Sequence, residues 1–350
     1  MNQSFWNGRR VLITGHTGFK GSWLAFWLKL LGAELCGYAL APETQPNLFE
    51  NLQLKNQIKS VIGDVRDLRA FEKALKDFQP EIVFHLAAQS LVRKSYRAPV
   101  DTYTTNVIGT INILEAVRSV DFVKAIVVVT TDKVYENKEW HWAYRENERL
   151  GGFDPYSNSK ACAEMATASY RNSFFAKSHT LIATARAGNV IGGGDWSEDR
   201  LLPDVFRSLI FDGKLLIRNP HSIRPWQHVL EPLAGYMKLA EKLYEGEKSF
   251  ADAWNFGSSE EDAKPVGWIL DEIKRIWNKP VNWEITDGKQ PHEAKILKLD
   301  STKAKSELEW LPKLSLEEAV NLTAEWYRGF KEKENLIELT KNQISFYQNK

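Results

Sequence analysis

Three glycines near the start of the chain, Gly15, Gly18 and Gly21, follow a short β-branched and aliphatic run at residues 11–13. The apolar-rich segment that comes directly after them, residues 22–31, is predicted to be a helix. In a strand, turn and helix of this kind, glycines let the backbone approach a pyrophosphate, and the helix N-terminus stabilises its negative charge. The pattern therefore predicts that this turn binds a dinucleotide.

Composition narrows the class of protein. With 350 residues, of which 43% are hydrophobic, the chain can bury a large core as one large domain or two closely joined ones. Its net charge of +1 argues against nucleic acid or an anionic membrane as a partner. Cys36 and Cys162 are too few for a disulfide framework and lack metal-ligand spacing. No signal peptide is evident, and no run approaches the ~18 apolar residues of a membrane span. We therefore expect a cytoplasmic protein that binds no metal.

Apolar runs alternate with helical patterns along the first half of the chain. Strands are predicted at residues 34–40, 59–62, 81–86 and 125–129, and helices at 68–78 and 99–117. This alternation predicts a Rossmann-type α/β fold, with a doubly wound parallel sheet and the ligand at the carboxyl ends of the strands. From residue 190 the rhythm changes. Gly192, Gly193 and Gly194 are interpreted as a flexible point that leads into a smaller, mostly helical domain.

The ends of the second and third strands bear on the choice of dinucleotide. Where many NAD-binding units carry an acidic residue, this chain has residues 39–41, Ala-Leu-Ala, and the nearest carboxylate is Glu43. No arginine follows that strand immediately, so the choice between NAD and NADP stays open here. Asp64, after the third strand, could reach the adenine end of the dinucleotide or could be a turn or helix-capping residue.

A second motif lies at residues 154–160, Asp-Pro-Tyr-Ser-Asn-Ser-Lys. Pro155 suits a first helical turn, and Tyr156 and Lys160 then share one face of the helix. An ammonium beside a phenol favours the phenolate and lowers its pKa toward the range of a general base. A surface pair is the alternative interpretation, but together with the glycine turn the catalytic one is favoured.

These motifs together resemble the short-chain dehydrogenase/reductase superfamily in its extended, nucleotide-sugar-modifying form. The resemblance also includes residues 85–89, His-Leu-Ala-Ala-Gln, and residues 186–189. It implies a cofactor-binding domain at residues 1–188, rejoined by part of about 229–258, and a sugar-nucleotide domain mainly at 189–350. It further implies Tyr156 as catalytic base and Lys160 on the nicotinamide ribose. The cofactor ligands that it implies are Gly15, Thr17, Gly18, Phe19, Gly21, Asp64, Val65, Leu86, Ala87, Ala88, Gln89, Asn106, Thr130, Tyr156 and Lys160.

Residues 130–135, Thr-Thr-Asp-Lys-Val-Tyr, follow a buried strand and resemble the sugar-nucleotide 4,6-dehydratases of this superfamily. Their Asp-Lys form, with segments 135–140, 188–196 and 224–229, is similar to the branch that acts on CDP-glucose. The resemblance implies an NAD-dependent lyase that forms a 4-keto-6-deoxy sugar for deoxysugar biosynthesis, as in lipopolysaccharide O-antigen. Thr131 would hold the sugar 4-oxygen and Asp132 would protonate the departing 6-hydroxyl. Lys133 replaces the usual glutamate and is expected to be the C5 base, to orient Asp132 or to stabilise an enolate.

Substrate binding and assembly complete the expectations. Arg224 is the strongest candidate diphosphate ligand, because a guanidinium can hold two phosphate oxygens. Asn189 and Arg200 are further candidates, with a structural turn and a surface salt bridge as their alternatives. The helices that start near Pro99 and Tyr156 resemble those that pair subunits in the superfamily, so a homodimer or homotetramer is expected. An epimerase of the same superfamily and a catalytically silent NAD-sensing protein remain the alternative functions.

Overall fold

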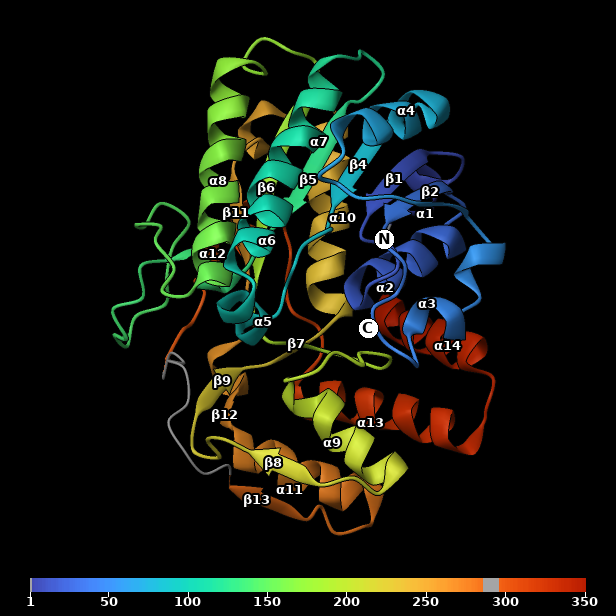
Figure 1. The fold of residues 1–350 in the computed structure, drawn as a ribbon, viewed down its shortest axis with the longest axis vertical. Helices are drawn as coiled ribbons and strands as arrows, with labels where there is room; N and C mark the ends of the chain where they lie inside the picture. The colour runs from blue at the N-terminus through green and yellow to red at the C-terminus, as the bar shows by residue number, and fades with distance from the viewer. Residues whose placement is uncertain (1, 286–295) are drawn as a thin grey trace.

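A seven-stranded sheet forms the centre of the computed structural model, which describes residues 2–285 and 296–350 (Figure 1). The strand order is β3-β2-β1-β4-β5-β6-β11, and each neighbouring pair is parallel. The strands span Arg10–Thr14 (β1), Glu34–Ala39 (β2), Lys59–Ile62 (β3), Ile82–His85 (β4), Ala125–Val129 (β5), Leu181–Ala187 (β6) and Ala253–Phe256 (β11). The predicted doubly wound parallel sheet is therefore confirmed.

Helices cover both faces of this sheet. The helices span Gln3–Trp6 (α1), Phe19–Leu30 (α2), Leu48–Asn51 (α3), Leu68–Phe78 (α4), Val92–Arg97 (α5), Pro99–Tyr103 (α6), Gly109–Arg118 (α7), Pro155–Ser173 (α8), Leu201–Phe211 (α9), Leu230–Tyr244 (α10), Val266–Trp277 (α11), Thr302–Glu307 (α12), Leu316–Glu332 (α13) and Leu336–Asn349 (α14). Val11 and Ile13 pack into a cluster with α2 and α10, whereas Leu12 packs into a second cluster with α4 and α7. This alternation places apolar side chains on both sides of every central strand.

Short strands outside the seven-stranded sheet pair with one another, and several single turns of helix connect the longer elements. The short strands span Val190–Ile191 (β7), Leu215–Ile217 (β8), Ile223–Pro225 (β9), Gln227–His228 (β10), Ala263–Pro265 (β12) and Trp283–Ile285 (β13), and they pair as β7 with β10, β8 with β13 and β9 with β12. Single turns of helix span Leu54–Asn56 (η1), Thr104–Ile108 (η2), Asp132–Val134 (η3), Lys248–Phe250 (η4) and Glu260–Asp262 (η5). Figure 1 shows β8, β9, β12 and β13 with α9, α11 and α13 in the half of the molecule below the sheet.

Most of the predicted strands and helices lie at the predicted residues. The strands at 59–62 and 125–129 and the helix at 68–78 have the predicted bounds. The helix predicted at 22–31 begins earlier, at Phe19, because Gly18 is its N-cap. The helix predicted at 99–117 is divided into α6 and α7 by the π-turn η2, which contains Asn106.

The prediction of flexibility at the glycine triplet was wrong. Gly193 and Gly194 are buried, and a Cβ on Gly193 would lie 2.0 Å from the ring of Trp326. A Cβ on Gly194 would lie 2.6 Å from Leu48, and the residue has a φ of +80°. Gly193 and Gly194 therefore serve close packing against α13 and α3 rather than chain mobility.

The C-terminal helix α14 packs against the N-terminal half of the chain. Tyr347 of α14 meets the ring of Trp27 in α2 edge-on, and its hydroxyl donates a 2.9 Å hydrogen bond to Glu231 Oε2 in α10. In Figure 1, α14 lies beside α2 and α3. Residues 253–256 also return to the sheet as β11. The predicted division of the chain at residue 188 stays a prediction.

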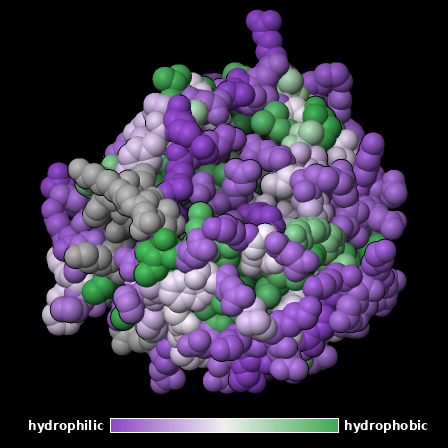
Figure 2. All heavy atoms as spheres, turned by 60° about the horizontal axis from the view of Figure 1, so that its bottom comes forward, coloured by the Kyte–Doolittle hydropathy of each residue, from purple (hydrophilic) through white to green (hydrophobic). Residues whose placement is uncertain are grey.

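The surface seen in Figure 2 is mostly hydrophilic, with hydrophobic side chains in small separate groups. In the described part of the chain, no helix has both the length and the apolar character needed to cross a membrane. Cys36 and Cys162 are free thiols.

Substituting Gly193 tests the packing at the triplet. Gly193→Ala should lower the free energy of unfolding by about 1–3 kcal/mol, because its methyl group must displace the Trp326 ring. Gly213→Ala is the matched control, since a Cβ there would lie 3.9 Å from its nearest neighbour, Ser208 Cα, and should change stability by less than about 0.5 kcal/mol. Urea titration of both variants would measure the difference. Equal effects would show that the triplet is not tightly packed.

Candidate active site

A cavity of about 1120 Å³ opens at the carboxyl ends of the central strands, where the loops after β1 to β6 converge. It is lined by all but one of the predicted cofactor, catalytic and substrate residues, namely Gly15, Thr17, Gly18, Phe19, Gly21, Asp64, Val65, Leu86, Ala87, Ala88, Gln89, Thr130, Thr131, Asp132, Lys133, Tyr156, Lys160, Asn189, Arg200 and Arg224. The exception is Asn106. The structure therefore brings all of the other predicted residues together around one cavity.

The glycine turn has the shape that a pyrophosphate requires. Gly15 has a φ of +77°, and a Cβ there would lie 2.8 Å from the backbone nitrogen of Ala87. A Cβ on Gly21 would lie 2.1 Å from the Gly15 carbonyl oxygen, so both glycines are needed to close the turn. Gly18 differs, since it is exposed to the cavity and caps α2 without a side-chain hydrogen bond. Its missing side chain leaves the N–H groups of the first turn of α2 accessible to a phosphate.

The far end of the cavity carries a group of charges after β3. Arg66 forms a 2.6 Å ion pair with Asp64 and another of 2.6 Å with Asp101. The hydrogen bonds from Arg66 lower the pKa of Asp64. Glu43, the carboxylate nearest to the end of β2, pairs with Lys94 at 3.1 Å. This end of the cavity therefore carries the carboxylate of Asp64, and the guanidinium of Arg66 is already paired with carboxylates.

Asn106 lies behind the cavity wall instead of lining it. Its side-chain nitrogen donates to the Gln89 carbonyl and to Ser159 Oγ, and its oxygen accepts from the Gln89 backbone nitrogen at 2.8 Å. Since Ser159 belongs to α8, Asn106 ties the loop after β4 to the helix of the Tyr-Lys motif. Asn106 thus supports the cavity wall at Gln89.

Tyr156 and Lys160 occupy the buried side of α8. Lys160 Nζ donates a 3.0 Å hydrogen bond to the carbonyl of Val129, at the end of β5. Burial lowers the pKa of Lys160 to about 8, and the negative charge of Glu164 partly opposes this. Burial raises the pKa of Tyr156, against the opposing effects of the Lys133 charge and the Thr131 hydroxyl. The expected lowering of the Tyr156 pKa by Lys160 is therefore not seen in this structure, because burial dominates and the largest opposing effect comes from the charge of Lys133.

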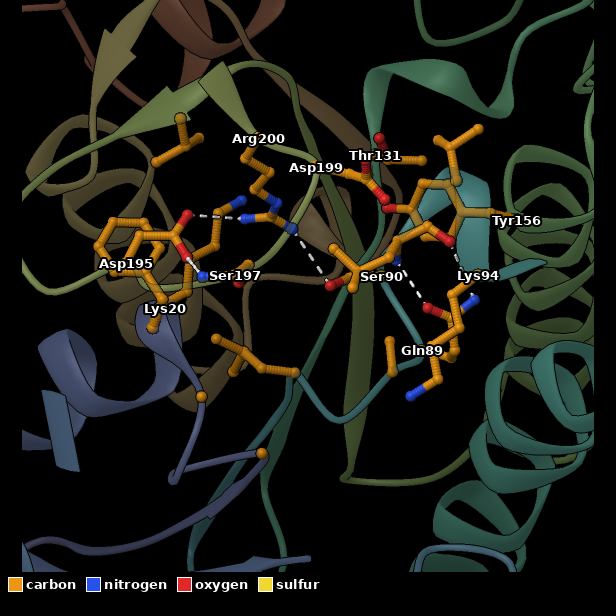
Figure 3. A pocket seen from close by; sticks show the side chains of 18 of the residues that line it. Lys20, Gln89, Ser90, Lys94, Thr131, Tyr156, Asp195, Ser197, Asp199 and Arg200 are labelled. Carbon is orange, nitrogen blue, oxygen red and sulfur yellow. Dashed lines mark hydrogen bonds and ion pairs between the residues drawn. The ribbon is translucent and has the colours of Figure 1, made fainter. Parts of the chain in front are cut away.

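Thr131, Asp132 and Lys133 form a hydrogen-bonded group directly after β5. Asp132 is 1% exposed, and its Oδ1 accepts a 2.9 Å bond from Thr131 Oγ1 and a 3.0 Å ion pair from Lys133 Nζ. Figure 3 shows Thr131 and Tyr156 on the same side of the cavity. A hydroxyl, a carboxyl, an amine and a phenol thus meet where β5 ends, which is the composition that proton transfers to and from a sugar require.

A buried ion pair connects the strands and the helix that carry these residues. Glu164, one helical turn after Lys160, pairs with Arg186 of β6 at 2.9 Å, and both residues are at most 3% exposed. Glu164 also accepts hydrogen bonds from Thr130 and Thr184. Burial raises the pKa of the Glu164 carboxyl, but Arg186 and the two hydroxyls more than reverse this and lower it. The pair therefore connects β5, β6 and α8 beneath the cavity.

The candidate substrate residues lie on the other wall. Arg200, the N-cap residue of α9, bridges Asp195 Oδ2 at 3.0 Å and Ser90 Oγ at 3.1 Å (Figure 3). Arg224 lies on β9 and lines the cavity. Asn189 has a φ of +41°, which fits a turn position, although it also lines the cavity. Two arginines therefore line the cavity, and the charge of Arg200 opposes the effect of burial on the Tyr156 pKa.

Two residues of the site, Lys20 and Glu164, were not predicted from the sequence. Lys20 lines the cavity between Gly18 and Gly21, and burial together with the charge of Arg200 lowers its pKa to about 7. A lysine at the start of an otherwise apolar helix was the signal that could have found it. Glu164 was detectable as well, since it continues the spacing of Tyr156 and Lys160 by another four residues.

The parallel sheet, the glycine turn and the Tyr-Lys pair at its carboxyl edge define a short-chain dehydrogenase/reductase of the extended form. Residues 12–323 match the family model described as GDP-mannose 4,6 dehydratase. The chain is also 49% identical to the CDP-glucose 4,6-dehydratase of Salmonella typhimurium over 352 residues, which cover 99% of this chain and 98% of the relative. The chain belongs to this family of nucleotide-sugar dehydratases.

Solved structures share the fold. A UDP-glucose 4-epimerase from Thermotoga maritima, solved with UDP-glucose, superposes with a TM-score of 0.80 at 23% identity, covering 92% of this chain and 99% of the epimerase. A dTDP-glucose 4,6-dehydratase from Bacillus anthracis, solved with NAD, gives a TM-score of 0.77 at 23% identity, covering 94% and 100% of the two chains. At this level of identity the likeness is one of fold.

Removing Glu164 should destabilise the protein strongly. Glu164→Leu leaves Arg186 buried without its partner, so the free energy of unfolding should fall by about 3–5 kcal/mol. The double variant Glu164→Leu/Arg186→Met removes both charges and should recover most of this loss. Glu115→Gln, which breaks the more exposed pair with Arg118, should cost less than about 1 kcal/mol in the same urea titration. A loss for Glu164→Leu no greater than that for Glu115→Gln would contradict the supporting role.

Proposed function

We propose that the protein is an NAD-dependent lyase that converts CDP-glucose to CDP-4-keto-6-deoxyglucose and water. The observation that carries the proposal is the meeting of Tyr156, Thr131, Asp132 and Lys133 at one cavity, in a chain 49% identical over its length to a CDP-glucose 4,6-dehydratase. Tyr156 and Lys160 suit the oxidation of an alcohol, whereas the adjacent Asp132 and Lys133 provide an additional acid and base. An elimination of water needs such a second pair of groups.

The cavity fits NAD better than NADP. The glycine turn would hold the pyrophosphate, Asp64 the adenosine end and Lys160 the nicotinamide ribose. Arg66, the cation nearest to Asp64, is already paired with Asp64 and Asp101, so it is poorly placed to bind a 2′-phosphate. When bound, NAD would supply a hydride acceptor for C4 of the sugar and, in its reduced form, a hydride donor for C6.

The first proton transfer falls to Tyr156. With Thr131 as hydrogen-bond partner of the sugar 4-oxygen, the Tyr156 phenolate would take the proton of the 4-hydroxyl. Lys133 and Thr131 both favour the phenolate against the effect of burial. The ketone that results at C4 makes the C5 proton acidic, which prepares the sugar for loss of water.

The ion pair of Lys133 and Asp132 provides the groups for the second step. Moving one proton across their 3.0 Å contact turns an ammonium and a carboxylate into a neutral amine and a carboxylic acid. The amine can then remove the C5 proton while the acid protonates the departing 6-hydroxyl. This exchange explains how a lysine can serve where relatives use glutamate, and it creates no net charge in a buried site.

The sugar nucleotide would lie along the wall that carries arginines. We assign the diphosphate to Arg224 and Arg200, with Asn189 as a further polar contact. The choice of cytosine is supported by the similarity to the Salmonella enzyme. The free thiols and the membrane-span finding are compatible with a cytoplasmic location, which we propose for this enzyme.

An assay with three sugar nucleotides tests the proposed function. Purified protein incubated with NAD and CDP-glucose should give the alkali-induced absorbance of a 4-keto-6-deoxy sugar, and dTDP-glucose and GDP-mannose should give little or none. A signal with another nucleotide would correct the substrate. No signal with any of them would overturn the dehydratase assignment in favour of an epimerase or a silent binding protein.

Replacing Asp132 should separate oxidation from elimination. Asp132→Asn keeps an acceptor for Thr131 but provides no carboxylic acid, so product formation should fall about 10²–10⁴-fold. Oxidation at C4 should continue, and the absorbance of reduced cofactor should therefore build up on the enzyme.

Asp199→Asn is the matched control for this variant, because Asp199 lines the same cavity but pairs with Arg93 at 3.2 Å. It should retain most of the activity. Wild-type product formation by Asp132→Asn would exclude Asp132 as the acid.

We also propose a homodimer formed through the helices near α8. Val100 of α6 is 75% exposed and Met165 of α8 is 54% exposed, and these two helices pack side by side (Figure 1). Exposed apolar side chains on neighbouring helices are typical of a subunit interface.

The double variant Val100→Glu/Met165→Glu should therefore shift the mass measured by light scattering to that of a monomer. Leu311→Glu, at another exposed apolar residue, should leave the mass unchanged. A monomeric wild-type protein would exclude the dimer.

A further inference from the structure

A second, much smaller cavity adjoins the candidate catalytic group. It measures about 30 Å³ and is lined in part by Asp132, Gly188, Pro225, Gln227, Gly257 and Ser258. We call it the small cavity. Asp132 and Gly188 also line the large cavity, so they form the wall between the two. The volume of the small cavity is enough for one water molecule, which needs about 10–15 Å³ of such space.

Two residues that line the small cavity have a buried side-chain oxygen without a hydrogen-bond partner in residues 2–285 and 296–350. Gln227 is 4% exposed, and its side-chain nitrogen donates to the carbonyls of Gly188 and Phe256 at 3.3 and 2.8 Å. These bonds fix the orientation of the amide, whose Oε1 is buried with no hydrogen-bond partner among the residues that the structure describes. The same holds for Ser258 Oγ. Two buried polar atoms around a water-sized space indicate a bound water, because unsatisfied buried acceptors are costly.

The two oxygens of Asp132 differ in their surroundings. Oδ1 accepts hydrogen bonds from both Thr131 and Lys133, whereas Oδ2 has no side-chain partner in the described chain. Oδ2 lies against Gly188, where a Cβ would approach it to 2.1 Å. Because Oδ1 already accepts hydrogen bonds from Thr131 and Lys133, Oδ2 is the oxygen that is left for a further hydrogen-bond donor. Glycine at position 188 leaves the space that this oxygen occupies.

The proposed reaction requires that this proton be replaced. In each turnover the O–H bond of Asp132 breaks, a proton joins the 6-oxygen, and the C6–O bond breaks to release water. Lys133, as the neutral amine, takes the C5 proton and returns it to C5, so it ends as the amine. Tyr156 has gained the proton of the 4-hydroxyl and must release it to solvent. The pair of Lys133 and Asp132 has therefore lost one proton and must regain it from solvent before the next cycle, and the large cavity holds the sugar nucleotide and cofactor during the reaction.

We propose that the small cavity holds a water molecule, bound by Gln227 and Ser258, that transfers the replacement proton to Asp132 from the side away from the sugar. The water gives one proton to the carboxylate and takes one from bulk solvent, so it is not consumed. The role of the water in catalysis rests on the proposed function, whereas the presence of the water does not. Gln227 and Ser258 are positioning residues, since they act on Asp132 through the water.

Crystals of the wild-type protein test the water directly. At high resolution the electron density should show one ordered water within hydrogen-bond distance of Gln227 Oε1 and Ser258 Oγ. An empty or apolar-filled cavity would overturn the proposal. This measurement does not depend on the substrate, and therefore it separates a failure of the proposal from a failure of the proposed function.

Two substitutions at Ser258 test the role of the water. Ser258→Val fills the small cavity, whereas Ser258→Ala leaves room for the water and removes only its contact with the hydroxyl. With CDP-glucose, Ser258→Val should form about one product per active site at the wild-type rate and then continue about 10-fold more slowly, as expected for the loss of an assisted proton transfer. Ser258→Ala should slow the later turnovers less than Ser258→Val does. A purely structural effect would slow the first turnover as well, and either that result or wild-type turnover by Ser258→Val would overturn the proposal. If Ser258→Val does not fold, the density in the wild-type crystals decides.

Discussion

The burial of both faces of the parallel sheet is the constraint on which the rest of this structure depends. Val11, Leu12 and Ile13 alternate between two apolar clusters, and the same alternation continues through the central strands. Polar side chains therefore have little room along the strands and gather where the strands end. The cofactor turn, Thr131, Asp132 and Lys133 all lie at that edge. The site thus follows from the way in which the sheet buries its strands.

Charges within the protein are stabilised in two different ways. Glu164 and Arg186 neutralise each other beneath the sheet edge and make additional hydrogen bonds, so they hold β5, β6 and α8 in a fixed relation. Lys133 and Asp132 are also paired, but Lys133 is 34% exposed at the cavity. A fixed ion pair supports the frame, whereas an ion pair at the cavity can exchange its proton with a substrate. The contrast separates a structural charge pair from the pair to which we assign proton transfer.

Much of the sheet and of the site could be predicted because both depend on local patterns. The strand at 125–129 is aliphatic and β-branched, and the helix at 68–78 has an apolar face of helical spacing, so their bounds were read directly. Residue spacing likewise brought Tyr156 and Lys160 to one helix face. The packing of Gly193 on Trp326 could not be predicted, since it joins residues far apart in the chain. The pKa of Tyr156 depends on burial, which the sequence does not specify, and the small cavity depends on the contact of Gly188 with Asp132.

The path of the chain between the two halves has a mechanical consequence. After β6 the chain leaves the sheet to form α9, β8 and β9, returns through α10 to β11, leaves again for α11, and ends with α14 packed against α2. The region beyond the sheet is therefore tied to it by several separate segments instead of one hinge. A rigid opening of the large cavity would have to bend all of these segments together. Exchange of substrate and product is thus expected to proceed through movements of individual loops around a frame that stays closed.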